Sequence, residues 1–142
     1  MEQFITFASN NGMLSAVWVA LVVMIIVTTI KINLSPIKQI SSQDLTFLIN
    51  REQGVALDIR TEKDFNANHI LDAISLSNDK ITKNGFASLE KHKANPIIVV
   101  CSAGLSAVKV ANDLHKAGFA RVSVLKGGMG AWTGAGLPVT KK

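Results

Sequence analysis

Short apolar segments alternate with polar, helix-compatible segments along most of this chain. Three of the apolar segments are nearly continuous runs, at residues 55–59, 97–100 and 122–125, and a weaker one lies at 70–76. Continuous runs are typical of strands that are buried on both faces of a parallel sheet. Because these strands alternate with helical segments, the pattern predicts a three-layer α/β domain with a parallel sheet over residues 37–142.

Capping and turn residues mark the helices between the strands. Ser41-x-x-Asp44 has the spacing of a capping box, which opens a helix, and Gly54 is placed to end it. Gly118 is placed to end a later helix in the same way. The pattern predicts helical segments over residues 41–53, within 61–68, over 86–92 and 107–117, and around Trp132.

The N-terminus has a different pattern. Residues 13–30 contain no charged side chain and are apolar all round a helix. At about 1.5 Å per residue such a helix reaches nearly across a hydrocarbon core of about 30 Å. A buried core helix is one alternative, but so small a domain has nothing to cover that surface. A cleavable signal peptide is another, but residues 1–12 lack Lys and Arg and no Ala-x-Ala-like site follows.

We therefore expect a retained single-pass anchor, with an extramembrane segment at residues 1–12, a transmembrane helix at 13–30 and a linker at 31–36. Glu2 is the only charged residue before the span, whereas Lys31 and Lys38 follow it. Positive residues favour the cytoplasmic side, so the domain is expected to face the cytoplasm. A single cysteine, which cannot form an internal disulfide, agrees with a reducing compartment.

The net charge of +5 raises the question of a nucleic-acid partner. The lysines are scattered, no basic stripe or aromatic platform accompanies them, and tyrosine is absent, so we expect no nucleic acid. Attraction of the basic domain to an anionic membrane surface is the use we expect for this charge. Three scattered histidines and one cysteine give no metal-ligand spacing.

Cys101 is the candidate reactive residue. It follows the apolar run 97–100, and a loop of small residues and a helix start come next. A strand, a tight loop and a helix N-terminus place a sulfur over backbone N–H groups, a setting that lowers the pKa of a thiol and favours a covalent intermediate. A lone cysteine after an apolar strand is also often a small core residue. The residues alone leave both interpretations open.

Several motifs stand in the order and spacing of a known family. With the apolar N-terminal run, the chain resembles the rhodanese homology domain over roughly residues 37–140, and in particular the membrane-anchored single-domain rhodaneses of Gram-negative bacteria. The segments that carry the resemblance are Asp58-Ile59-Arg60 with Glu62-x-x-Phe65, the stretch 68–74, the loop Cys101-Ser102-Ala103-Gly104-Leu105-Ser106, and the closing residues Leu125-Lys126-Gly127-Gly128, Ala131-Trp132 and 135–139.

The resemblance implies a sulfurtransferase in the bacterial inner membrane. The Cys101 thiolate would attack the outer sulfur of a donor such as thiosulfate, form a persulfide and pass the sulfur to a thiol or protein acceptor. This mechanism needs no cofactor and no metal. The resemblance places the anion in the loop, with Ser102, Ala103, Gly104, Leu105 and Ser106 as the substrate-binding residues.

The sequence departs from the family at three positions. Many rhodanese loops end in Arg, whereas Ser106 ends this one, so backbone amides and the hydroxyls of Ser102 and Ser106 are expected to hold the anion. Asn68 and Asp72 stand where the family has glycine, which affects the turn geometry expected there.

Other polar residues of the motifs are expected to be structural. Asp58 and Arg60 are expected to pair with each other or to cap backbone groups in support of the site. His69 is expected to bond the backbone. 

A second function of another class stays open. The domain is also compatible with a membrane-tethered binding module of weak or no catalysis, which would present its surface to a membrane-protein partner. Cysteine phosphatase chemistry ranks lower, because it requires a longer loop that ends in Arg, and Ser106 cannot grip a phosphate in that way.

Overall fold

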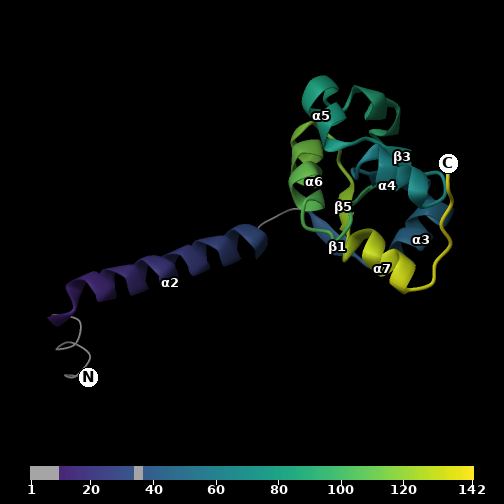
Figure 1. Cartoon of the computed structure of the whole chain (residues 1–142). Helices are drawn as coiled ribbons and strands as arrows, with labels where there is room; N and C mark the ends of the chain where they lie inside the picture. The colour runs from purple at the N-terminus through teal and green to yellow at the C-terminus, as the bar shows by residue number, and fades with distance from the viewer. Residues whose placement is uncertain (1–9, 34–36) are drawn as a thin grey trace. The chain divides into compact units, whose positions relative to one another are not determined.

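The computed structural model describes residues 10–33 and 37–142. It divides the chain into two compact units with the boundary between Ser35 and Pro36. The first contains one described helix, α2 (Gly12–Asn33), drawn in purple and blue in Figure 1. The predicted span 13–30 lies inside α2, and the helix continues over residues 31–33 into the predicted linker 31–36. Residues 1–9 and 34–36 lie outside the described residues.

Helix α2 has the length and composition of a membrane span. Its segment Gly12–Ile30 has a mean hydropathy of 2.6, and large apolar side chains such as Trp18 and Ile25 are exposed on the helix. The hydroxyls of Thr28 and Thr29 donate to the carbonyls of Met24 and Ile25, both over 2.8 Å, so these polar groups are satisfied within the helix.

The second unit is an α/β domain built on a five-stranded sheet. The strands are β1 (Lys38–Ile40), β2 (Val55–Asp58), β3 (Ile74–Ser75), β4 (Ile97–Val100) and β5 (Val122–Leu125). All four pairings are parallel, and the strand order is β1-β5-β4-β2-β3. Strand β4 is central and every one of its residues is buried, which explains its uninterrupted apolar sequence. The predicted parallel α/β fold is therefore confirmed.

Helices cover both faces of this sheet (Figure 1). The helical segments are α3 (Ser42–Glu52), α4 (Glu62–Ala67), α5 (Asn78–Asn84), the 3₁₀ helix η1 (Ala87–His92), α6 (Ala107–Lys116) and α7 (Gly128–Gly134). One core lies beneath α5, η1 and α6 and contains Leu57, Val99 and Leu114, whereas the other lies beneath α3 and α7 and contains Ile98 and Trp132.

The capping box predicted for α3 is present. The backbone N–H of Asp44 donates to the Ser41 hydroxyl over 3.2 Å, and the backbone N–H of Ser41 donates to the Asp44 carboxylate over 3.1 Å. These bonds satisfy backbone donors that the first turn of a helix leaves without partners. The helix then buries Leu45 against the sheet.

Two predictions about elements are corrected by the structure, and two further elements were not predicted. The segment predicted as a strand over 70–76 pairs only at Ile74–Ser75, because the chain turns after Ile70, where the N–H of Ala73 donates to the Ile70 carbonyl. The helix predicted over 86–92 is a 3₁₀ helix over Ala87–His92. Strand β1 and helix α5 are elements that the apolar pattern did not predict.

Candidate active site

The site is built at the carboxyl end of the central strand. Val100 is the last residue of β4, and Cys101 follows it. In the sheet register Val100 pairs with Asp58 of β2, and Asp58 pairs with Ser75 of β3. Three neighbouring strands therefore end in one row, and the carboxyl end of a parallel sheet is where ligands bind in folds of this class.

The sulfur of Cys101 lies in a cradle of hydrogen-bond donors. Cys101 is a free cysteine with 4% of its surface exposed, and the backbone N–H of Gly104 donates to its Sγ over 2.9 Å. Burial acts to raise the pKa of this thiol, but hydrogen bonds to the sulfur act in the opposite direction and prevail, so the pKa of Cys101 is lowered. In order of effect the donors are the Ser106 hydroxyl and the backbone amides of Ala107, Gly104 and Ala103.

The loop from residue 102 to 106 forms the outer wall of this cradle. Ser102, Ala103 and Ser106 are exposed, and Leu105 is 87% exposed. Gly104 has a φ of 92°, a conformation that glycine adopts readily and other residues rarely do, and a Cβ there would lie 3.2 Å from the backbone nitrogen of Gly127. The close approach of residues 104 and 127 shows that the loop rests on the connection between β5 and α7.

The start of α7 holds the backbone of the loop. The N–H groups of Met129 and Gly130 donate to the carbonyls of Cys101 and Ser102 over 2.8 and 3.1 Å. A Cβ on Gly128 would lie 2.1 Å from the Cys101 carbonyl oxygen, so only glycine allows this approach. The motif that contains Gly127 and Gly128 gave no indication of this supporting role.

The loop reaches α6 through Ser106. Ser106 is the residue before the helix, and its hydroxyl makes no capping bond to the helix backbone. That hydroxyl is instead among the donors to the Cys101 sulfur. No Lys or Arg lies between Cys101 and Ser106, so the donors around the sulfur are uncharged.

Asp58 and Arg60 form a buried ion pair beside the site. Nη2 and Nε of Arg60 donate to the Asp58 carboxylate over 2.7 and 3.0 Å. The side chain of Arg60 is 8% exposed and that of Asp58 is 2% exposed. Arg60 also donates to the carbonyl oxygen of Asn68 over 2.6 Å. The pair therefore ties the end of β2 to the segment after α4, and within the described part of the chain none of its hydrogen bonds goes to the Cys101 sulfur.

His69 is engaged away from the sulfur. Its Nδ1 lies 2.7 Å from the Phe65 carbonyl oxygen, its ring stacks on the Phe65 ring at 3.9 Å, and its backbone pairs with Thr140. Asp72, where the family has glycine, has a φ of 60°, so the chain keeps a left-handed turn there without glycine. Within residues 10–33 and 37–142, no group of three or more His, Cys, Asp and Glu side chains is placed to hold a metal ion.

Known proteins share this architecture. Residues 41–135 match the family described as Rhodanese-like domain. The uncharacterized protein YibN of Escherichia coli strain K12 is 41% identical over 141 residues, which cover 99% of this chain and 99% of the relative. The thiosulfate sulfurtransferase GlpE of Pseudoalteromonas translucida is 36% identical over 98 residues, 69% of this chain and 90% of the relative. The solution structure of the rhodanese-like domain of the Anabaena Alr3790 protein superposes with a TM-score of 0.64 at 28% identity, over 73% of this chain and 79% of that one.

Proposed function

This chain belongs to the rhodanese-like domain family, and from that premise we propose that it is a membrane-anchored sulfurtransferase whose Cys101 carries the transferred sulfur as a persulfide. The observation that supports the proposal is the sulfur cradle: a free thiol at the end of the central strand, with a lowered pKa and several hydrogen-bond donors directed at it. Its similarity to a thiosulfate sulfurtransferase supports thiosulfate as the class of donor.

In the first step the Cys101 thiolate attacks the outer sulfur of thiosulfate. A new S–S bond forms on Cys101, the S–S bond of thiosulfate breaks, and sulfite leaves with that electron pair. The donors that stabilise the thiolate are also placed to stabilise the charge of the persulfide. The role of the loop residues from Ser102 to Ser106 is to hold the anion with backbone amides and hydroxyls.

In the second step the thiolate of an acceptor attacks the outer sulfur of the persulfide. The acceptor leaves with the sulfur, and the Cys101 thiolate is restored, so no oxidant or reductant and no cofactor takes part. A small thiol or a protein thiol fits this role, and in the test tube the carbon of cyanide attacks the outer sulfur in the same way and leaves as thiocyanate. Because the loop has no cation, we expect the thiosulfate dianion to bind weakly and the activity to be low.

The apolar N-terminal helix is the feature that bears on where the protein is located. We propose that residues 13–30 anchor the protein in the bacterial inner membrane, that residues 1–12 lie outside, and that the domain of residues 37–142 faces the cytoplasm. The apolar surface of α2 supports the anchor, and the lysines on its C-terminal side support the orientation. A membrane protein that accepts the sulfur is then a partner that this location would favour.

A second function, a membrane-tethered binding module, is favoured by the uncharged loop. An assay of the full chain in detergent with thiosulfate and cyanide separates the two. We expect thiocyanate production by the wild-type chain and none by Cys101→Ser, which keeps the shape of the loop but replaces the thiolate with a hydroxyl that barely ionises. Equal rates for the two chains would support the binding module instead.

A further inference from the structure

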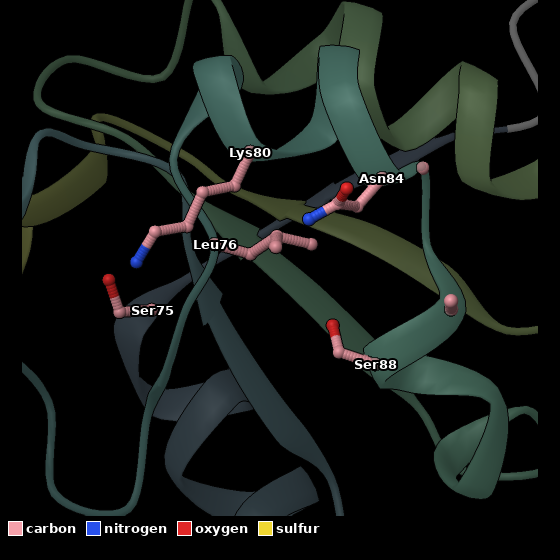
Figure 2. Close-up of a pocket in the computed structure, with 7 residues that line it drawn as sticks. Ser75, Leu76, Lys80, Asn84 and Ser88 are labelled. Atoms are coloured by element: carbon pink, nitrogen blue, oxygen red, sulfur yellow. The ribbon is translucent and has the colours of Figure 1, made fainter.

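A pocket of about 630 Å³ lies beside strand β3, and its lining residues are outside the segments that resemble the motifs of the family. It is lined by the end of β3, by α5 and by the start of η1, and its volume is within the range of small-molecule sites. Figure 2 shows Lys80 and Ser75 on one side of it and Asn84 and Ser88 on the other, with Leu76 between them.

The lining of this pocket suits an anion. Lys80 is the only charged residue among those that line it, and Ser75, Asn84 and Ser88 offer neutral hydrogen-bond groups. The charge of Lys80 and the polar side chains of Asn84 and Ser88 are the groups that a ligand oxygen would meet there.

A ligand carboxylate that binds Lys80 would have to replace the carboxylate of Glu62. The Lys80 Nζ donates to the Glu62 carboxylate over 3.0 Å, but the side chains of Lys80 and Glu62 are 48% and 68% exposed. An ion pair that exposed contributes little, so a carboxylate of a ligand exchanges with Glu62 at small cost.

The pocket lies at the carboxyl end of the sheet, as the Cys101 sulfur does. Ser75, Asp58 and Val100 are register partners on three adjacent strands, and Cys101 follows Val100. At about 4.8 Å per strand the Ser75 backbone is therefore about 10 Å from that of Val100. A second pocket of about 520 Å³ shares Lys80 and extends to Ile59, whose backbone N–H donates to the Val100 carbonyl.

We propose that the pocket around Lys80, Asn84 and Ser88 binds the carboxylate end of the sulfur acceptor, a small thiol that carries at least one carboxylate. The proposal rests on the sulfurtransferase function. The carboxylate lies against Lys80 and the polar side chains of Asn84 and Ser88, and the thiol of the same molecule reaches Cys101. There the thiolate attacks the outer sulfur of the persulfide, the enzyme S–S bond breaks and the Cys101 thiolate leaves, so atoms and electrons balance without a further reactant.

Charge variants of the full chain in detergent test the proposal with two acceptors, glutathione and its diethyl ester, which differ in their carboxylates. We expect Lys80→Gln to reduce the preference in kcat/KM for glutathione over the ester several-fold, and Glu62→Gln to increase it because Lys80 loses its competitor. Lys116→Gln, a matched charge removal at the far end of α6, should leave the preference at the wild-type value. An unchanged preference in both the Lys80 and Glu62 variants would overturn the proposal.

A binding measurement keeps this test separate from the proposed function. In the Cys101→Ser chain, titration calorimetry with S-methylglutathione, which cannot accept sulfur, should show binding that weakens several-fold when Lys80→Gln is added. Ser88→Ala should weaken it too without lowering the melting temperature, because Ser88 is exposed and the substitution removes only a hydroxyl of the pocket wall. Binding independent of Lys80 would exclude the carboxylate site. Lys80-dependent binding in a protein that takes no sulfur from thiosulfate would refute the acceptor role and the proposed function, but not the site.

Discussion

The backbone N–H of Gly104 donates a hydrogen bond to Sγ of Cys101 over 2.9 Å, from a φ of 92°. This conformation turns the loop back over the residue that begins it. Burial alone would raise the pKa of Cys101. The hydrogen bond from Gly104 and those from the other donors around the sulfur outweigh burial, so this pKa is lowered although no cation is present in the loop. The environment of this thiol therefore depends on the shape of the backbone and on one hydroxyl.

The first prediction concerns that hydroxyl. Ser106 contributes the largest hydrogen-bond effect that lowers the pKa of Cys101. Ser106→Ala should therefore raise this pKa, reduce the thiolate fraction at neutral pH and move the ultraviolet titration of the thiolate to higher pH. Since the folded-state pKa is below that of an unfolded cysteine, the stability contributed by the thiolate is present at high pH and is lost as pH falls through the folded-state value.

The matched control is Ser102→Ala, which removes an exposed hydroxyl from the same loop. Ser102 is not among the groups that shift the pKa of Cys101, so the thiolate titration of Ser102→Ala should coincide with that of the wild type. Coincident titrations for all three chains would show that the Ser106 hydroxyl does not reach the sulfur.

The second prediction concerns the support of the loop by α7. Gly128→Ala places a Cβ against the Cys101 carbonyl, so we expect a loss of at least about 3 kcal/mol in the free energy of unfolding, at the upper end of overpacking effects. Gly134→Ala in the same helix meets no atom within 4 Å and should be neutral or stabilising by about 0.5–1 kcal/mol. Chemical denaturation of both variants measures the difference, and similar losses would contradict the close approach.

The third prediction concerns the buried ion pair. Asp58→Asn leaves the Arg60 guanidinium buried without its carboxylate, so we expect a loss of about 3–5 kcal/mol in the free energy of unfolding. Glu90→Gln removes an exposed partner of Lys93 and should cost at most about 1 kcal/mol. An Asp58 variant as stable as the Glu90 variant in the same denaturation experiment would mean that the pair does not support the fold.

The fourth prediction concerns the orientation of the anchor. Lysines that follow the apolar segment favour the cytoplasm, so a reporter active only in the cytoplasm should give a signal when it is fused after Lys142. A reporter active only in the periplasm should stay silent at the same position. The opposite pair of signals would reverse the proposed topology.

Apolar patterning predicted the core of the fold because β2, β4 and β5 are nearly continuous apolar runs. Strand β1 was missed because Lys38-Gln39-Ile40 is short and mostly polar, as suits an edge strand whose first two residues are exposed. Helix α5 was missed because Asn78–Asn84 contains one apolar residue, the half-buried Ile81, and therefore shows no helical period.

The candidate site was predictable to a similar extent. The position of Cys101 after a buried strand and before a small-residue loop is local in sequence, so the sequence indicated it. The bonds from Met129 and Gly130 to the loop are not local, because they depend on β5 lying next to β4 in the strand order. The pocket beside Lys80 depends likewise on α5 and on the short pairing of β3, two features that the apolar pattern did not resolve.

The most direct test of the sulfurtransferase account is the intact mass of the full chain after thiosulfate is added and excess reagent is removed. The account predicts a gain of one sulfur atom that peptide mapping places on Cys101, that an acceptor thiol removes, and that Cys101→Ser does not show. A wild-type chain whose mass stays unchanged at saturating thiosulfate, while the domain is folded, would contradict it.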